Sequence, residues 1–328
     1  MNTTRTILKI IAAVAVMAVT MGSHGLALAQ TKLKVTYLPT LDATPLFIGI
    51  EKGYFKEQGL EITPVPVAGG AAAMPGLMAG SYDILYGNIV STLLARQQGL
   101  KVLVVGAGTK QFEDVGGTGL IARKADQFKS GKDLEGKTVA VNTRNGVIWL
   151  YARAWVAKTG GDPDKVTFRE VPFPQMNDAL RGKQVDAAFQ IPPFFDMAVS
   201  TGEIDVIGEP YKDVQPGVEI GQDVATEDFY NKNRELIAKF RRGLSKGVAF
   251  FNANQKNPET IRVMAATTKL QPEMISKMDL GRLPDVIDPA MLARTAALMK
   301  ENRLLSAEID VKSLDVPEAL QWARVRCA

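Results

Sequence analysis

The chain has 328 residues, of which 39 are basic and 35 acidic, for a formal net charge of +4, and 46% of its residues are hydrophobic. This weak positive balance, without a clustered basic face, argues against nucleic acid as a partner. The length exceeds what one hydrophobic core commonly fills and indicates two lobes.

The first residues predict an export signal. Arg5 and Lys9 precede an apolar run at 10–21, and the sequence ALA follows at 27–29. This order of charge, apolar run and small residues is typical of a secretory signal peptide. The run is shorter than the roughly 20 residues that a membrane-spanning helix needs. We therefore expect 1–29 to be a signal peptide cleaved after Ala29, and a mature protein that diffuses freely in the periplasm.

Two rare residue types argue against catalysis. The only histidine, His24, lies in the predicted signal, and the only cysteine, Cys327, lies next to the C-terminus. The mature chain therefore lacks the residues for a Ser-His-Asp triad, a Cys-His pair or a histidine-based metal site. A single cysteine cannot close a disulfide within the chain. We expect a protein that is not an enzyme and needs neither a cofactor nor a metal.

From residue 33 onward, strands and helices are predicted to alternate. Alternating or β-branched residues indicate strands at 33–37, 60–67, 83–86 and 102–105, and helices are indicated after Thr44-Pro45, at 71–79 and at 90–98. Thr44 is predicted to cap the first of these helices. Because such alternation favours a mostly parallel sheet with helices on both faces, residues 30–115 are expected to form the first part of a doubly wound lobe.

A second series with the same alternation follows. It consists of strands at 119–122, 138–142, 165–171 and 185–190, with helices at 147–159 and 174–181. Residues 116–212 are therefore expected to form a second lobe. The segments 106–118 and 208–221, rich in glycine and charge, are the two expected crossings of a hinge. Residues 213–328 are expected to return to the first lobe and add C-terminal helices, in which Leu236, Phe240, Leu244 and Val248 form a core stripe.

Three motifs resemble a known family. The sequence PLFIGIEKGYFKEQGL at 45–60 is similar to the opening signature of the nitrate, sulfonate and taurine class of ABC solute-binding proteins, which also includes binders of thiamine-pyrimidine precursors. The sequences DLEGK at 133–137 and LRGKQVDAA at 180–188 resemble its second-lobe signatures. The resemblance implies a type II periplasmic-binding-protein fold, in which two doubly wound α/β lobes close on a ligand. It also implies an ABC permease and an ATPase as partners.

The turns that follow the predicted strands supply the candidate binding residues. Ligands of open α/β sheets bind outside the carboxyl ends of the strands, where helix N-termini offer unpaired N–H groups. The residues expected there are Asp42, Thr44, Gly69, Gly70, Ala71, Asn88, Asn142, Arg144, Asn145, Trp149 and Gln190.

Several of these residues have two open interpretations. Asp42 fits either the binding of an ammonium group or the capping of a helix, and Asn88 fits either donation to a ligand or an N-cap. The Arg144 guanidinium suits a bidentate grip on a carboxylate or sulfonate, or lies in solvent. Trp149 lines the cleft or belongs to the core. Gly69 and Gly70 would let the backbone approach a ligand closely.

The ligand itself stays open at this point. Helix N-termini and Arg144, with no acidic residue in 142–146, favour a small organic anion such as a sulfonate, nitrate or carboxylate. A neutral heteroaromatic compound, such as a thiamine-pyrimidine precursor or a flavin, is the alternative, because the same amides bind carbonyl groups. A third hypothesis is a periplasmic sensory module that signals to a receptor. The resemblance alone does not choose among them.

Overall fold

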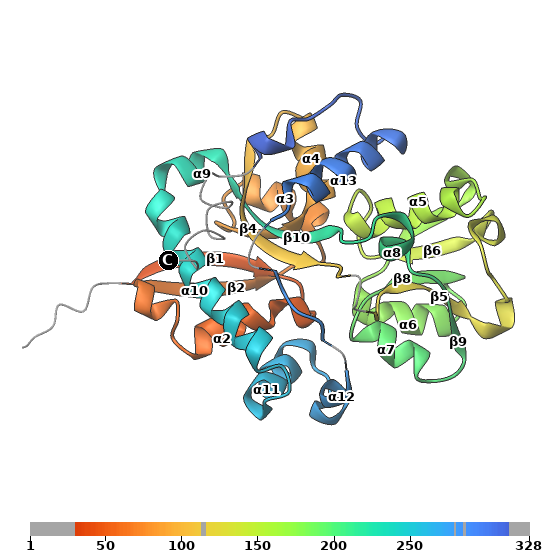
Figure 1. The fold of residues 1–328 in the computed structure, drawn as a ribbon, viewed down its shortest axis with the longest axis horizontal. Helices are drawn as coiled ribbons and strands as arrows, with labels where there is room; N and C mark the ends of the chain where they lie inside the picture. The colour runs from red at the N-terminus through yellow and green to blue at the C-terminus, as the bar shows by residue number, and fades with distance from the viewer. Residues whose placement is uncertain (1–29, 113–115, 279, 285–286, 315–328) are drawn as a thin grey trace, which may run out of the picture.

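The computed structural model describes residues 30–112, 116–278, 280–284 and 287–314. Two α/β lobes lie side by side (Figure 1). The predicted signal peptide at 1–29 and Cys327 lie outside the described residues. Among the helices that the structure describes, none combines the length and the apolar character needed to cross a bilayer.

The first lobe contains a mixed sheet. Its strands are β1 (Thr31–Tyr37), β2 (Leu60–Pro66), β3 (Leu85–Asn88), β4 (Val102–Lys110) and β10 (Glu219–Thr226). β1 and β2 pair in parallel, and β10 lies between β3 and β4, antiparallel to both. A parallel bridge between Val35 and Ile84 joins the two groups. The strand β10 was not predicted: its first three residues fell in the expected crossing at 208–221 and the others were left unassigned, because glycine, glutamine and aspartate lower the β propensity of its sequence.

The second lobe contains a sheet with the same plan. Its strands are β5 (Gly119–Arg123), β6 (Thr138–Val141), β7 (Thr167–Glu170), β8 (Ala187–Gln190) and β9 (Ile204–Gly208), in the order β7-β6-β8-β5-β9. β5 is antiparallel to both of its neighbours. The chain crosses between the lobes from β4 to β5 and again from β9 to β10. In each lobe the strand that follows a crossing is therefore the antiparallel one.

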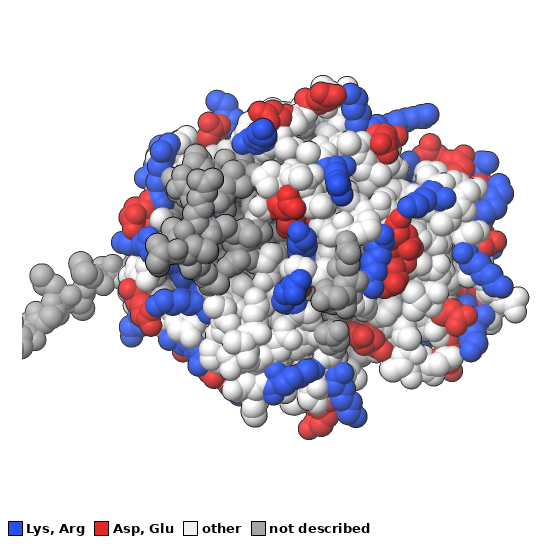
Figure 2. Space-filling model, in the orientation of Figure 1, with Lys and Arg blue, Asp and Glu red and all other residues white. Residues whose placement is uncertain are grey.

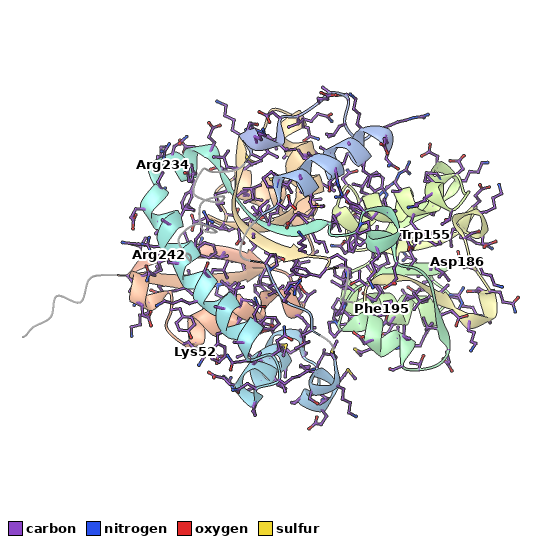
Figure 3. The ribbon with its side chains drawn as sticks, viewed as in Figure 1. Lys52, Trp155, Asp186, Phe195, Arg234 and Arg242 are labelled. Carbon is purple, nitrogen blue, oxygen red and sulfur yellow. The ribbon has the colours of Figure 1, made fainter. Side chains whose placement is uncertain are left out.

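Helices cover both sheets. They are α2 (Thr44–Glu51), α3 (Gly70–Met78), α4 (Ile89–Gln97), α5 (Val147–Lys158), α6 (Phe173–Arg181), α7 (Phe194–Val199), α8 (Pro210–Val214), α9 (Glu227–Lys232), α10 (Arg234–Ala253), α11 (Pro258–Thr268), α12 (Pro272–Lys277) and α13 (Pro289–Glu301). In the second lobe, α5 and α7 lie on opposite sides of the sheet (Figure 1). Their aromatic residues Trp155 and Phe195, both labelled in Figure 3, are buried.

The long helix α10 packs across the first lobe. Phe240 and Val248 of this helix are buried, and Leu236 and Leu244 are partly buried against the core. The predicted core stripe is therefore confirmed. The Phe240 ring stacks on Phe55 with 5.7 Å between centroids. Gly247 lets α10 approach α2, because a Cβ there would overlap the Pro45 carbonyl.

The helix α13 contacts both lobes. It packs against α4 of the first lobe. Its Thr295 hydroxyl lies 3.1 Å from the hydroxyl of Tyr151 on α5 of the second lobe. One cluster of buried apolar side chains accordingly runs from Val90 and Leu93 through the second lobe to Leu292 and Met299.

Charged side chains of both signs are interspersed over the face drawn in Figure 2. Many form ion pairs at the surface, such as Lys232 with Asp228 on α9 and Lys52 with Glu259. Exposed pairs of this kind contribute little to stability. This face therefore offers no extended field of one sign.

Candidate functional site

A cavity of about 1010 Å³, part of it open to solvent, lies between the two lobes. The first lobe and the crossings contribute Asp42, Gly69, Gly70, Tyr86, Asn88, Thr109, Lys110 and Phe112, among others, and the second lobe contributes Asn142, Val147, Ile148, Phe173 and Pro192. Leu280, Gly281, Arg282 and Leu283, from the segment after α12, complete the lining. Of the residues predicted from the sequence, the structure brings together Asp42, Gly69, Gly70, Asn88 and Asn142.

The glycines at 69 and 70 lie in tightly packed surroundings, Gly69 against the second lobe and Gly70 against the first. A Cβ at Gly69 would lie 2.8 Å from Nδ2 of Asn142 and 2.9 Å from Cγ2 of Thr143, both on the second lobe. A Cβ at Gly70 would lie 2.7 Å from the Cα of Gly87. The turn therefore needs glycine for packing between the lobes as well as for access to its amides. Ala71, in the next position, is partly buried and does not line the cavity.

Asn88 caps the helix α4. Its Oδ1 accepts a hydrogen bond from the Ser91 backbone N–H at 3.0 Å, which confirms the N-cap interpretation. The residue also lines the cavity. The cap uses only Oδ1, and Nδ2 makes no side-chain hydrogen bond to any residue that the structure describes.

Asp42 does not cap a helix, so that interpretation is wrong. The N-cap of α2 is Ala43 rather than the predicted Thr44, and it makes no side-chain cap bond. Thr44 is fully buried, donates to the Leu41 carbonyl at 2.6 Å and does not line the cavity. Oδ2 of Asp42 instead accepts a hydrogen bond from the Tyr86 hydroxyl at 3.4 Å. Burial raises the pKa of Asp42 to about 6, and the bond from Tyr86 acts in the opposite direction.

Four predicted residues of the second lobe lie outside the cavity lining. Arg144 and Asn145 are exposed, and the Arg144 backbone N–H donates to Glu170 on β7. This acidic neighbour comes from a distant part of the sequence, so the local pattern at 142–146 gave no sign of it. Trp149 is buried with its ring edge-on to Phe168, as the core interpretation expects.

Gln190 is the fourth of these residues. It is fully buried, and its Nε2 donates to the Phe173 carbonyl at 3.1 Å and to Oδ1 of Asn177 at 3.0 Å. The side-chain amide therefore fixes the start of α6 against β8 instead of reaching the cavity. A glutamine at the end of a strand gives no sequence signal that separates these two roles.

The structure places two cationic side chains at the cavity that the sequence did not single out. Lys110, at the end of β4, lies 3.6 Å from Glu219 and 4.0 Å from Asp288. The Arg282 guanidinium lies over the Phe112 ring, 4.3 Å from its centroid. Lys110 is the last residue of β4 and lies within the crossing predicted at 106–118, so its position in the sequence could have marked it as a candidate for the cavity. Arg282 lies in a segment without periodicity, and no pattern pointed to it.

Glu219 starts the strand β10 directly after the second crossing. Its side chain is buried and accepts a hydrogen bond from the Asp288 backbone N–H at 3.1 Å. Burial raises the pKa of Glu219 to about 7, although this bond and the Lys110 ammonium lower it. The carboxyl group therefore holds its proton to a higher pH than an exposed glutamate does.

Comparison with known proteins decides the family. Residues 40–258 match the family described as NMT1/THI5 like. The chain belongs to this family. The predicted family resemblance is thereby confirmed, since alkanesulfonate- and nitrate-binding proteins are also among its structural neighbours.

Individual relatives are distant. The riboflavin-binding protein RibY of Chloroflexus aurantiacus is 24% identical over 311 residues, which cover 87% of this chain and 84% of the relative. The alkanesulfonate-binding protein SsuA of Xanthomonas axonopodis pv. citri, bound to MOPS, superposes with a TM-score of 0.73 at 16% identity, covering 87% and 98% of the two chains.

A ligand-binding component of an ABC-type import system from Staphylococcus aureus, solved with zinc bound, superposes with a TM-score of 0.74 at 14% identity. The match covers 90% of this chain and 99% of that structure's chain. At this level of identity the structures show a shared fold, and they confirm the predicted periplasmic-binding-protein class. Within the part of this chain that the structure describes, no group of three or more His, Cys, Asp or Glu residues is placed to hold a metal ion.

Proposed function

We propose that this protein is the solute-binding component of an ABC importer. In this proposal, the chain is exported to the periplasm, cleaved after Ala29, and delivers a captured small molecule to a permease and its ATPase. The family, the fold and the cavity between the lobes support this function. A similar structure from Staphylococcus aureus is named as such a component.

The observation that favours an anionic ligand is the convergence of helix N-termini on one cavity. Gly70 starts α3, Asn88 caps α4 and Val147 starts α5, and all three line the cavity. Each N-terminus carries unpaired N–H groups and the positive end of a helix dipole. Within the described residues, Arg282 forms no ion pair and adds a positive charge from the segment after α12. A sulfonate, nitrate or carboxylate group would be stabilised by these N–H groups and by the positive charge of Arg282.

A neutral heteroaromatic ligand remains the second candidate, on a separate observation. The aromatic rings of Tyr86, Phe112, Phe173 and Tyr211 all belong to residues that line the cavity. Aromatic side chains stack on planar rings, and backbone amides bind ring carbonyls. The relative RibY is named as a riboflavin-binding protein.

Both lobes contribute to the cavity lining, so a bound ligand can favour the closed arrangement of the two lobes. A ligand shifts an equilibrium between open and closed forms only through its differential affinity for the two. A ligand that touches Gly70 on one lobe and Asn142 on the other gains contacts only in the closed form. The closed form is then the state that a permease recognises; a receptor in place of the permease would make the protein a sensory module.

A thermal-shift screen of the mature protein tests the proposal. Alkanesulfonates, nitrate, aromatic carboxylates, an aminopyrimidine and riboflavin are compared, and each hit is measured by calorimetry. Binding raises stability by RT ln(1 + [L]/Kd). Binding of an anion but not of riboflavin supports the first candidate, and the reverse result supports the second. Conversion of a bound compound into a product contradicts both.

A further inference from the structure

The last residue of β4 and the first residue of β10 form a charged pair beside the two crossings. Lys110 and Glu219 are partners in the register of these antiparallel strands. The first crossing begins directly after Lys110, and the second ends directly before Glu219. The Gln111 N–H donates to the Val218 carbonyl at 2.9 Å and joins the crossings next to the pair. The pair therefore lies where the chain passes between the lobes.

Lys110 lines two depressions. One is the cavity between the lobes, which we call the main cavity. The other is a groove of about 950 Å³, open to solvent, whose lining includes Glu219 and Asp288. The Lys110 side chain is 20% exposed, and its Nζ lies 3.6 Å from Oε1 of Glu219. At this distance the charges attract while a hydrogen bond is weak, so the ammonium group has donors to offer a ligand.

Glu219 is the buried member of the pair. Its side chain is 1% exposed. Oε1 accepts the hydrogen bond from the Asp288 backbone N–H, whereas Oε2 is buried and has no hydrogen-bond partner among the residues that the structure describes. Burial of a carboxylate oxygen without a donor disfavours the ionised form. A proton on Oε2 removes the negative charge, and Lys110 then loses its counter-charge.

The charged groups around Glu219 come from three segments of the described chain. Lys110 ends β4, and Asp288 precedes α13 and lies 4.0 Å from Lys110. Arg282 lines the same groove from the segment after α12. The residues of α10 in this lining carry no charge, and they are Val248, Ala249 and Asn252. With both carboxyl groups ionised, two cations face two anions, and one proton on Glu219 leaves a positive charge beside the main cavity.

From this arrangement we infer that Lys110 binds the anionic group of the ligand and that Glu219 controls this contact. An ionised Glu219 competes with the ligand for the ammonium group, and a protonated Glu219 leaves the ammonium group to the ligand. The inference rests on the proposed function, because it takes an anionic ligand as given. It adds that the anion is captured together with a proton, so acidic surroundings favour capture and alkaline surroundings favour release.

The pH range of the effect follows from Glu219. Burial raises its pKa to about 7. An anion that engages Lys110 draws the ammonium group from the carboxylate and raises this pKa further, so the complex keeps a proton that the free protein has released. Anion affinity should therefore fall as the pH rises from about 7 to about 8.

Asp42 is a second titrating group at the main cavity. It lines the cavity, and burial raises its pKa to about 6. Its ionisation repels an anion, so it also weakens anion binding with rising pH, mostly between about pH 5 and 7. A comparison of variants at Glu219 separates the two contributions, because Asp42 is the same in all of them.

Glu219→Gln tests the control of the contact, since glutamine has the shape of the protonated side chain. The tightest binder among benzenesulfonate, methanesulfonate, nitrate and benzoate is measured with the mature protein by calorimetry at about pH 6 and about pH 8. At about pH 8, roughly a tenth of Glu219 is protonated, so Glu219→Gln should bind the anion about tenfold more tightly than the unchanged protein. At about pH 6 the two affinities should be similar. Calorimetry in buffers of different ionisation enthalpy should also show less proton uptake in the variant at about pH 8.

Lys110→Met tests the contact itself. It should weaken anion binding at about pH 6 by about tenfold or more, the scale of one charge-assisted hydrogen bond. In this background Glu219→Gln should cause no further gain at about pH 8. Glu235→Gln on α10 is the matched control, because Glu235 is exposed and pairs with Arg242. Misfolding does not produce a gain of affinity, so Glu219→Gln decides the matter even if Lys110→Met fails to fold.

The outcomes separate the inference from the proposed function. If an anion binds and folded Lys110→Met retains the affinity of the unchanged protein, the inference is overturned and the anionic ligand stands. The same holds if Glu219→Gln and Glu235→Gln bind the anion equally at about pH 8. Binding of none of the four anions contradicts the anionic ligand and, with it, the inference.

Discussion

Nδ2 of Asn142 on the second lobe donates a hydrogen bond to the carbonyl oxygen of Ala68 on the first lobe, over 3.2 Å. The bond lies beside Gly69, which has no room for a side chain in this arrangement. The lobes therefore touch at one edge of the main cavity through a single turn from each side. This contact is available only when the lobes are close together.

Gly69→Ala is expected to disfavour the closed form. Its added methyl group would meet Asn142 and Thr143, while the extended backbone at this position tolerates alanine. We expect a ligand identified in the screen to bind about tenfold more weakly, with a larger radius of gyration by X-ray scattering in its presence. The unchanged protein is the reference, because Gly87, where a methyl group would have room, itself lines the cavity. Equal affinities of Gly69→Ala and the unchanged protein would show that the Gly69 contact does not govern closure.

The two arginine hypotheses can be separated directly. If Arg282 contacts an anion, Arg282→Ala should weaken anion binding by about 1.5 to 3 kcal/mol, the scale of a hydrogen bond to a charged group, and Arg282→Lys should recover part of it. The sequence-based hypothesis assigns the same loss to Arg144→Ala. Because the Arg144 side chain is exposed and outside the lining, we expect little change there. Calorimetry on both variants with one anion decides which arginine binds.

Stability should fall as the pH rises from about 4 to about 7. Burial raises the pKa of Asp42 to about 6, of Glu219 to about 7 and of Asp223 to about 7. In this window the folded protein holds protons that the unfolded chain has released, so the free energy of unfolding decreases with increasing pH. Urea denaturation of the ligand-free protein across this range measures how the free energy of unfolding changes with pH. A free energy that stays constant or increases with pH would contradict the raised pKa values.

Asp223→Asn isolates one of these groups. At about pH 8 the variant should be more stable than the unchanged protein by roughly 1 to 3 kcal/mol, since one unit of pKa difference corresponds to about 1.4 kcal/mol. At about pH 3 this contribution should vanish, because the carboxyl group is then largely protonated in both the folded and the unfolded states. A variant that is less stable at about pH 8 would contradict this expectation and show that the charge of Asp223 supports the fold through Arg241.

Two neighbouring tyrosines should respond oppositely to loss of the hydroxyl group. The Tyr151 hydroxyl donates to Oε1 of Gln215 at 2.9 Å and lies 3.1 Å from Thr295, so Tyr151→Phe should destabilise the protein by about 1 to 3 kcal/mol. The buried Tyr211 hydroxyl has no hydrogen-bond partner among the described residues, although its ring lies 5.1 Å from that of Tyr151. Tyr211→Phe should therefore be neutral or stabilising. Chemical denaturation of both variants tests the pair, and similar losses would contradict the hydrogen-bond argument.

The parts of the fold that could be predicted are those with local patterns. The helix α5 was expected at 147–159 and spans Val147–Lys158, because its apolar residues recur at helical spacing up to the glycines that follow. The strand β9 escaped prediction because two of its five residues are exposed and the segment is short. Its pairing with β5 depends on contacts between distant parts of the sequence.

The candidate site divides in the same way. Gly69, Gly70 and Asn88 were identified because a strand followed by a helix leaves its turn at the cavity, whatever the tertiary details. Arg144 and Gln190 lie on similar turns, but their surroundings depend on other elements: Glu170 accepts a hydrogen bond from the Arg144 backbone N–H, and Asn177 accepts one from the Gln190 side chain. A single sequence does not show these partners.

The position of β10 has a consequence for how the protein is made. The second lobe, from β5 to β9, is one uninterrupted stretch of chain, whereas the sheet of the first lobe lacks its strand between β3 and β4 until residues Glu219–Thr226 have been synthesised. In a chain that emerges from its N-terminus, the later lobe can complete its sheet before the earlier one. The first residues to emerge thus remain without their full set of sheet partners for more than a hundred residues of synthesis. Under the proposed export, such a delay would keep the first lobe incompletely paired, and an unfinished lobe is easier to thread through a translocation channel than a finished one.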